Sequence, residues 1–342
     1  MRCSKKTKCL IITFGPYHDK PWWWRWTESH RITCNLEYVR ISLGSKKSKD
    51  LTIFQIPTLA KKLFRLLLEA KGKYEFIFTF ECDWTSLIIS FLQTALHITR
   101  PKHVILQFIM REREDTWRSK AKYVFMKYIF KSVYLCICSS AREIEHYKKE
   151  FNWQSSKLGF VPFHTDPDYL KYPEKTKCDF ILSVGRSFRD YNTLIDAVRG
   201  INIDTIIIAS KHNVLTKCPT NVRVEYDQSM DVVCDYIARS RLVVLPLQDR
   251  QISIGQSVLL QAMAMGKPVI VTRTSGTEDY VEDRKTGVFV KPHDVDELRN
   301  KILFLYNNSS ARETLGLNAK KTVIEKYLPM NYVEGVSYII SR

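Results

Sequence analysis

The sequence predicts an α/β protein made of two doubly wound domains in tandem. Short runs of consecutive apolar residues recur along the whole chain, as in parallel strands that are buried on both faces of a sheet. Segments with helical periodicity separate these runs, which is the order of elements in βαβ units. With 342 residues, of which 45% are hydrophobic, the chain is long enough for two domains of ordinary size, each with its own core.

The second half shows this alternation most clearly. Predicted strands lie at 180–184, 205–209, 222–226, 241–245, 268–272 and 288–290. Helices are predicted at 191–199, 232–240 and 256–265, and from 294 onward. The helix at 256–265 is the best defined of these, because Gly255 precedes it, Gly266 ends it and Pro268 follows.

The first half has the same pattern with weaker signals. Predicted strands lie at 9–14, 39–42, 76–80, 104–108 and 133–138, and predicted helices at 58–71, 84–96, 120–131 and 141–151. A segment rich in Pro and charged residues follows, and it has no periodicity. We therefore expect an N-terminal domain at 1–163, a linker at 164–177 and a second domain at 178–328.

The positive charge is concentrated in the first half. Residues 1–160 hold 29 Lys or Arg and 14 Asp or Glu, whereas residues 161–342 hold 24 and 22. This asymmetry predicts a polyanionic partner for the first domain, either an anionic membrane surface or nucleic acid.

Cysteine usage and apolar segments exclude several classes of protein. The nine Cys are scattered and form no C-x-x-C pair, which favours reduced thiols in a cytosolic protein over disulfides or a zinc site. The first apolar run is too short for a signal peptide, and the longest, near 86–98, falls below the roughly 20 residues of a membrane span. We therefore expect a soluble or peripheral protein.

The start of the helix at 256–265 is a candidate phosphate site. At Gly255, Gln256 and Ser257 several backbone N–H groups lack helical partners, and the positive end of the helix dipole lies there. Ser253 and Gln261 are eight residues apart, a little over two helical turns, so both can face one ligand. Such junctions occur in every parallel α/β unit, however, and most of them bind nothing.

Three basic residues follow the first two strands of the second domain. Arg186 and Arg189 come after the strand at 180–184, and Lys211 comes after the strand at 205–209. Two guanidinium groups at the end of a strand suit bidentate binding of a diphosphate, although solvated loop arginines would give the same pattern. Ligands of such sheets bind beyond the carboxyl ends of the strands, so we expect a shared site in the cleft between the domains.

Three motifs carry a resemblance to a known family. GRSFRDYNTLIDAV, ARSRLVVLPL and SVLLQAMAMGKPVIVTRTSGTEDYVEDRKTGVFV occur in the order and spacing of the C-terminal domain of glycosyltransferase family 4. The resemblance covers residues 178–328 strongly and the first half only in outline. It implies the GT-B fold, in which two Rossmann-like domains face each other across a cleft. It also implies transfer of a sugar from a nucleotide-sugar donor with retention of configuration, usually without a metal, and a last helix at 329–342 that crosses back to the first domain.

The resemblance also implies roles for the donor-site residues. Arg186 matches the family's arginine after the glycine of its turn, and Arg189 stands where the family usually has a lysine. Both would neutralise the diphosphate leaving group. Gly15 resembles a residue of the family's short glycine loop.

The chain departs from the family at its paired glutamates, which are spaced E-x7-E. Gln261 occupies the second position, which usually holds the ribose hydroxyls, and Ser253 occupies the first, or Asp249 if the loop is longer. A glutamine oxygen still accepts a hydrogen bond, without charge assistance. Backbone N–H groups at 255–257 would compensate for the lost carboxylate that engages the transferred sugar.

Candidate acceptor-side residues follow strands of the first domain. Glu81 and Asp83 follow the strand at 76–80, and Arg111, Glu112 and Glu114 follow the strand at 104–108. Glu81, Asp83 and Glu112 are the only catalytic candidates. The loop at 15–31 holds four Trp, which suit sugar stacking, a membrane interface or packing under the loop.

Three further features have simpler explanations. His164 lies in the predicted linker and is expected to be structural. Asp166 and Asp168 imitate a metal-binding D-x-D but lie in the same linker, so no metal site is predicted. The segment at 117–134 mixes Lys with aromatic residues at helical spacing, as in a helix lying on an anionic membrane, although a plain surface helix is also consistent.

The sequence therefore predicts a cytoplasmic retaining glycosyltransferase that is peripherally associated with the inner face of the membrane. It would use a nucleoside-diphosphate sugar, no cofactor and no metal, and a glycan or lipid-linked acceptor in cell-surface polysaccharide or glycolipid synthesis. No nucleic-acid partner is expected, since no nucleic-acid-binding motif is visible. The alternative, suggested by Ser253 and Gln261, is a non-catalytic or weakly active nucleotide-sugar-binding subunit that partners an active transferase.

Overall fold

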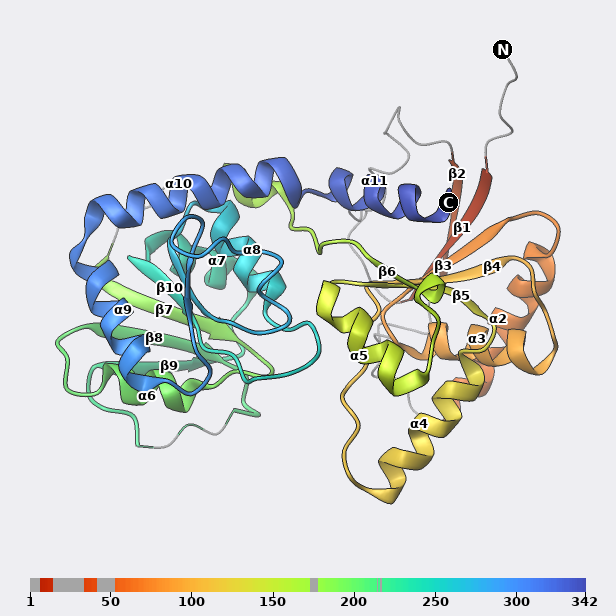
Figure 1. Ribbon diagram of the computed structural model, residues 1–342, viewed down its shortest axis with the longest axis horizontal. Helices are drawn as coiled ribbons and strands as arrows, with labels where there is room; N and C mark the ends of the chain where they lie inside the picture. The colour runs from red at the N-terminus through yellow and green to blue at the C-terminus, as the bar shows by residue number, and fades with distance from the viewer. Residues whose placement is uncertain (1–6, 15–33, 42–52, 173–177, 214, 216) are drawn as a thin grey trace, which may run out of the picture. The chain divides into compact units, whose positions relative to one another are not determined.

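A computed structural model describes residues 7–14, 34–41, 53–172, 178–213, 215 and 217–342. The chain divides into two compact units (Figure 1). Unit 1 comprises Met1–Val161 and Val333–Arg342, and unit 2 comprises Pro162–Tyr332. Each unit is built on one parallel sheet, so the predicted α/β class with two doubly wound domains is confirmed.

The described part of unit 1 contains a six-stranded parallel sheet in the order β2-β1-β3-β4-β5-β6. Its strands are β1 (Thr7–Phe14), β2 (Cys34–Ile41), β3 (Phe76–Phe80), β4 (Lys102–Leu106), β5 (Val133–Cys138) and β6 (Leu158–Phe160). Its helices are α2 (Ile56–Ala70), α3 (Trp84–Ala95), α4 (Trp117–Ile129) and α5 (Ala141–Phe151), with the short 3-10 helices η3 (Ile53–Gln55) and η4 (Ser155–Lys157). Most of the last helix, α11 (Pro329–Ile340), also belongs to this unit.

Two clusters of buried side chains hold unit 1 together. Leu59, Leu63 and Leu67 recur every four residues along α2 and pack against the apolar side chains of β1 and β3. The second cluster is aromatic, with Phe108 packed on Tyr147 and on the neighbouring rings under α4 and α5. In α11, Gly335 lies against Val161, next to β6.

His103 of β4 is fully buried among hydroxyl groups. Its Nε2 lies 2.8 Å from Oγ1 of Thr79, and its Nδ1 lies 3.3 Å from Oγ of Ser90. The Ser90 hydroxyl donates to the carbonyl of Ser86, so Nδ1–H donates to Ser90 and Nε2 accepts from Thr79. The ring is therefore held in one neutral form, and burial lowers the pKa of His103 from 6.5 to about 3.

We expect acid to destabilise the protein through His103. The unfolded chain takes up a proton near pH 6.5, whereas the folded chain does so only near pH 3, so stability falls as the pH drops through this window. The slope contributed by His103 approaches about 1.4 kcal/mol per pH unit. Urea unfolding at pH 7 and pH 4.5 should show a smaller loss of stability for His103→Asn than for the wild type. Equal losses of stability between pH 7 and pH 4.5 in the two proteins would contradict this role of His103.

Unit 2 contains a second six-stranded parallel sheet, in the order β12-β11-β10-β7-β8-β9 within its described residues. The strands are β7 (Phe180–Gly185), β8 (Asp204–Ala209), β9 (Val222–Tyr226), β10 (Leu242–Leu245), β11 (Val269–Thr272) and β12 (Val288–Val290). The helices are α6 (Tyr191–Val198), α7 (Met230–Arg239), α8 (Gln256–Ala264), α9 (Val295–Asn307) and α10 (Ser309–Lys326), and a 3-10 helix, η5 (Pro167–Lys171), lies within the predicted linker.

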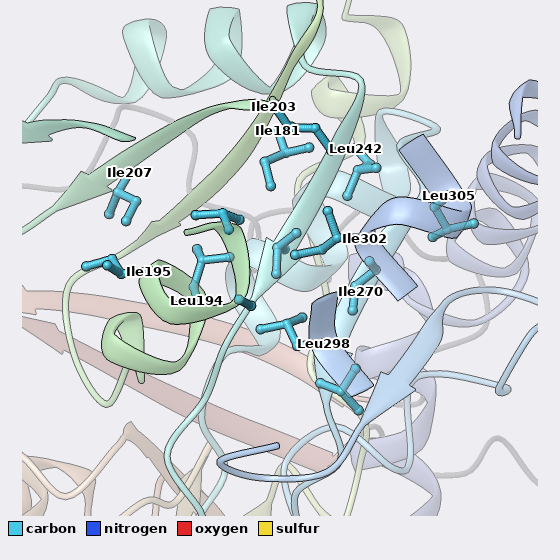
Figure 2. Packing of buried hydrophobic residues seen from close by; sticks show 14 of the residues in the cluster. Ile181, Leu194, Ile195, Ile203, Ile207, Leu242, Ile270, Leu298, Ile302 and Leu305 are labelled. Carbon is cyan, nitrogen blue, oxygen red and sulfur yellow. The ribbon is translucent and has the colours of Figure 1, made fainter. Parts of the chain in front are cut away.

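The core of unit 2 explains its continuously apolar strands. α6 and α9 pack on one face of the sheet, where Leu194, Leu298 and Ile302 meet Ile181 and other strand residues (Figure 2). α7 and α8 cover the opposite face (Figure 1). Side chains on both faces of each central strand are thus buried, as the sequence pattern predicts.

The order of the strands in unit 2 fixes where a ligand can bind. From β7 the chain moves outward through β8 and β9, then returns to place β10 on the other side of β7. The loops after β7 and β10 therefore begin at the carboxyl ends of two neighbouring strands and lead to α6 and α8, on opposite faces of the sheet. Such a switch point is where open parallel sheets bind their ligands.

Candidate functional site

The candidate site lies at this switch point, where the backbones of two loops are joined. The N–H of Gln248, after β10, donates to the carbonyl of Phe188, after β7, at 3.1 Å. The N–H of Asp190 donates to Pro246 at 2.9 Å, and Arg189 forms a β-bridge with Leu247. The loop that carries Arg189 is therefore fixed to the loop that leads into α8.

The start of α8 exposes backbone donors. Its N-cap is Gly255, with a φ of +87°, and no side chain caps the helix there. Side chains cap the neighbouring helices of unit 2, as Asp190 does for α6 and Ser229 for α7. The first N–H of α8 with a helical acceptor is that of Leu259, which donates to Gly255. The preceding N–H groups and the positive end of the helix dipole therefore suit an anionic ligand.

Close packing fixes this helix start on both sides. A Cβ added to Gly255 would lie 2.8 Å from the side chain of Leu247. A Cβ on Gly276, in the loop after β11, would lie 2.6 Å from the backbone nitrogen of Ile254. The buried Gln256 donates from Nε2 to the carbonyl of Gly276 at 2.7 Å. The loops after β7, β10 and β11 thus form one connected structure around the start of α8.

Replacing Gly255 by Ala should disturb this structure. The positive φ costs about 1–2 kcal/mol for a residue with a Cβ, and displacement of Leu247 adds to this cost. We expect the variant to be less stable than Gly200→Ala, because Gly200 also has a positive φ, +77°, but no atom within 4 Å of an added Cβ. Urea unfolding of both variants checks this, and equal stabilities would contradict it.

Arg189 is buried in the turn after β7 rather than extended into solvent. Its Nε donates to the carbonyl of Val184 at 3.3 Å and one terminal nitrogen donates to Ser187 at 2.9 Å. The guanidinium lies against Gly185, where any Cβ would overlap it. Burial lowers the pKa of Arg189, and no carboxylate of the described residues lies within ion-pair distance. A buried positive charge without a counter-ion is costly, and a bound anion would relieve that cost.

Arg186 and Lys211 are exposed at the same edge of the sheet. Arg186 follows β7 directly, and Lys211 follows β8, the neighbouring strand. Neither side chain forms an ion pair within the described part of unit 2. Ser257, in the first turn of α8, is exposed as well. Three cations and a helix start therefore follow the carboxyl ends of β7, β8 and β10.

The two positions of the expected glutamate pair are both buried. Gln261 is 3% exposed, and its Nε2 faces two sulfur atoms of α7, Sγ of Cys234 at 3.1 Å and Sδ of Met230 at 3.5 Å. Its Oε1 accepts no hydrogen bond from the described residues. Ser253 is buried in the loop before α8. The amide oxygen of Gln261 is thus the group that remains for a ligand hydroxyl.

The candidates in unit 1 are less well organised. Asp83 caps α3, since it accepts from the N–H of Ser86 at 2.9 Å and from its hydroxyl at 3.2 Å. Its carboxylate therefore has a structural role that makes it a weak catalytic candidate. Glu81 is exposed with a φ of +53°, and Glu112 is half-buried after β4. Gly15 and the loop with four Trp lie outside the described residues.

The described residues show neither a metal-ion cluster nor a membrane-spanning helix. They contain no group of three or more His, Cys, Asp and Glu arranged to hold a metal ion. Asp166, of the D-x-D pattern, accepts from the N–H of Asp168 and caps η5. His164 is buried against Phe163 and Tyr332, in a packing position. None of the described helices is both long and apolar enough to cross a membrane.

Three residues that shape the site lie within the quoted motifs, but the sequence predicts no role for any of them. Leu247 joins the two loops, and its N–H donates to Oγ1 of Thr272 at 2.9 Å, which ties in the end of β11. Gly276 admits the side chain of Gln256. Apart from these motifs, the local signal is a Thr- and Gly-containing turn directly after a predicted strand, which is typical of loops in general.

Comparison with known sequences gives a family match within unit 2 and partial matches to curated proteins. Residues 180–308 match the family described as "Glycosyl transferases group 1". The chain is 30% identical over 135 residues to an uncharacterized glycosyltransferase of Methanocaldococcus jannaschii, covering 37% of this chain and 38% of that protein. It is 26% identical over 193 residues to the capsular polysaccharide biosynthesis glycosyltransferase CapM of Staphylococcus aureus, covering 51% and 49%. The chain thus spans about half, or less, of the length of these curated relatives.

Solved structures extend the similarity to the whole fold. HepE of Anabaena, in complex with UDP and glucose, has a TM-score of 0.70 at 14% identity, covering 98% of this chain and 99% of HepE. A glycosyltransferase from Rickettsia africae has a TM-score of 0.69 at 13% identity, covering 98% of each chain. At these identities the likeness concerns the fold. The protein therefore has the GT-B fold of two Rossmann-like domains, and its second unit is similar in sequence to the group 1 glycosyl transferases.

Proposed function

We propose that this protein is a retaining glycosyltransferase that takes its sugar from a nucleoside-diphosphate donor. The observation that carries the proposal is the buried Arg189, which lacks a carboxylate partner and is joined through Leu247 to the uncapped start of α8. A diphosphate would supply the missing negative charge. The family match covers this segment, and HepE is described in complex with UDP and with UDP-glucose.

The proposed donor site divides its tasks between loops. Arg189 and the N–H groups of α8 would bind the diphosphate, and Arg186 and Lys211 would add charge from the solvent side. Oε1 of Gln261 would accept from a ribose hydroxyl, and the loop at Ser253 would meet the transferred sugar. Neutralisation of the developing diphosphate charge is the main catalytic contribution, and it needs no metal ion when cations of the protein supply it.

The proposed reaction uses no side-chain nucleophile. An acceptor hydroxyl would attack the anomeric carbon on the face from which the diphosphate departs, and a diphosphate oxygen would take its proton. The bond to the acceptor oxygen forms as the bond to the diphosphate breaks, so configuration is retained. In this route no carboxylate of unit 1 has to act as a nucleophile.

The acceptor is proposed to be a glycan or lipid-linked saccharide at the inner face of the membrane. Supporting this, α4 has a solvent-facing apolar stripe, with Trp117 74% exposed and Val124 71% exposed, and Phe125 and Tyr128 continue it. The helix contains Lys and Arg but no Asp or Glu. An apolar stripe flanked by cations is the pattern of a helix lying on an anionic membrane. The relative CapM is named for capsular polysaccharide biosynthesis.

Turnover tests the proposed activity directly. Purified protein is incubated with UDP-, GDP- and ADP-sugars, with and without extracted membranes as a source of acceptor, and release of the free nucleotide is measured. Acceptor-dependent release supports a transferase. If the protein binds a nucleotide but releases none from any donor sugar, whatever the acceptor concentration, the result would instead favour a non-catalytic binding subunit.

Sedimentation with phosphatidylglycerol and with phosphatidylcholine vesicles tests the membrane contact, which should require the anionic lipid.

A further inference from the structure

A hollow in unit 1 has a lining that the proposed transfer reaction does not use. It lies at the amino ends of β4 and β5, whereas Glu81 and Glu112 follow the carboxyl ends of β3 and β4. Its volume is about 900 Å³. Among the described residues its lining has no Asp or Glu, but it includes three lysines and three large aromatic side chains: Lys102, Lys131, Lys157, Tyr128, Tyr134 and Trp153.

Two of these lysines carry positive charge that the described residues leave unbalanced. The ammonium of Lys102 lies 4.3 Å from the ring centre of Tyr134, and that of Lys131 lies 5.5 Å from the ring centre of Tyr128. Neither forms an ion pair with a carboxylate of the described residues. Lys157 differs, because its Nζ donates to the carbonyls of Phe130 and Lys131 and so closes the carboxyl end of α4.

One polar atom of the lining also lacks a hydrogen-bond partner among the described residues. Gln93 is 2% exposed, and its Nε2 donates to the carbonyl of Pro101 at 2.7 Å. Its Oε1 is buried without a hydrogen-bond partner among the described residues. Thr99, Asn152 and Gln154 add exposed hydroxyl and amide groups. The hollow thus combines ring faces, hydroxyl and amide groups, and lysines without acidic partners.

We propose that this hollow binds an anionic saccharide, a segment of sugar units that carry carboxylate or phosphate groups. Ring faces pack against the apolar faces of sugar rings, and amide and hydroxyl side chains match sugar hydroxyls. Lysines bind phosphate and carboxylate groups as point charges. The volume lies within the range of small-ligand pockets. The inference goes beyond the proposed transfer reaction and does not depend on it, because no donor-site residue takes part.

Calorimetric titration of the full chain without nucleotide tests this inference. The probes are a hexamer of galacturonic acid, neutral maltohexaose and the single strand (dT)12. We expect the acidic hexamer to bind, maltohexaose to bind at least about tenfold more weakly, and Lys102→Ala/Lys131→Ala to lose about tenfold or more of the affinity for the acidic hexamer. The single variant Tyr128→Ala should weaken binding as well, since Tyr128 is exposed and lines the hollow.

The matched control removes the same charge elsewhere in unit 1. Lys61 of α2 and Lys127 of α4 are exposed and do not line the hollow, so Lys61→Ala/Lys127→Ala should bind like the wild type. Absence of binding at millimolar hexamer, or equal losses in both double variants, would overturn the proposal. Binding of (dT)12 about tenfold tighter than the hexamer would also overturn it, and would assign the hollow to single-stranded nucleic acid. Arg186→Ala should leave hexamer binding unchanged, which separates this test from that of the donor site.

Discussion

Replacing Arg189 by Met is expected to lower the affinity for a nucleoside diphosphate by about a hundredfold, with little change in the stability of the nucleotide-free protein. Charge-assisted hydrogen bonds to a buried diphosphate contribute about 1.5–3 kcal/mol, which corresponds to this loss. Without nucleotide, the variant loses two hydrogen bonds to carbonyls but also removes a buried charge that no carboxylate balances. We therefore expect the free energy of unfolding to change by no more than about 1 kcal/mol.

Two controls separate the proposed ligand-binding role of Arg189 from its packing role. Arg189→Lys keeps the charge but not the bidentate fork, so its affinity should lie between those of the wild type and Arg189→Met. Arg199→Met removes an exposed arginine of the same unit, paired with Asp196, and should leave nucleotide binding unchanged. Calorimetric titration and urea unfolding measure both quantities. Loss of stability with unchanged nucleotide affinity would show that Arg189 is a structural residue only.

The largest expected effect on stability is that of Gly316→Ala in α10. Alanine in place of glycine normally stabilises a helix by about 1 kcal/mol. Here the added Cβ would overlap the carbonyl oxygen of Gly266 and lie 3.0 Å from its carbonyl carbon. Both partners are backbone atoms and cannot rotate away, so we expect a destabilisation of about 3 kcal/mol.

The effect of Gly316→Ala should also reach the proposed donor site. Gly266 ends α8 with a φ of +68°, and its N–H and that of Lys267 donate back to Met263 and Ala262. A shift of this turn displaces the carboxyl end of the helix whose start is proposed to bind phosphate. Glu313→Ala, on the exposed side of the same helix, is the control and should change stability by less than about 0.5 kcal/mol. Comparable stabilities of the two variants in urea unfolding would refute the packing argument.

Most elements of the fold could be predicted because their signals are local. The helix predicted at 256–265 is observed at Gln256–Ala264, and the strand predicted at 222–226 has the same bounds in the structure. The strand predicted at 104–108 begins earlier, at Lys102, since His103 is polar in sequence but buried by partners distant in the chain. β6 has three residues and is too short to show any periodicity.

The site was less predictable, because burial and partners depend on distant segments. The sequence places Arg186 and Arg189 in one turn but does not distinguish them. In the structure Arg189 is buried against Gly185, whereas Arg186 is exposed. Gln261 is oriented by Cys234, which lies 27 residues away in the chain. Asp83 did carry a local signal, since an Asp directly before a predicted helix favours an N-cap over a catalytic role.

The most direct test of the central claim, a donor-nucleotide site at the carboxyl ends of the strands of unit 2, is calorimetric titration with UDP, GDP and ADP. Arg186 is exposed and forms no ion pair with another described residue. Arg186→Ala therefore removes one charge without disturbing the packing of the turn. We predict that the wild type binds at least one of the three nucleotides with a Kd between about 1 μM and 1 mM. Arg186→Ala should bind it about tenfold more weakly. Absence of binding of all three nucleotides to the wild type, or equal affinities of the two proteins, would contradict the account.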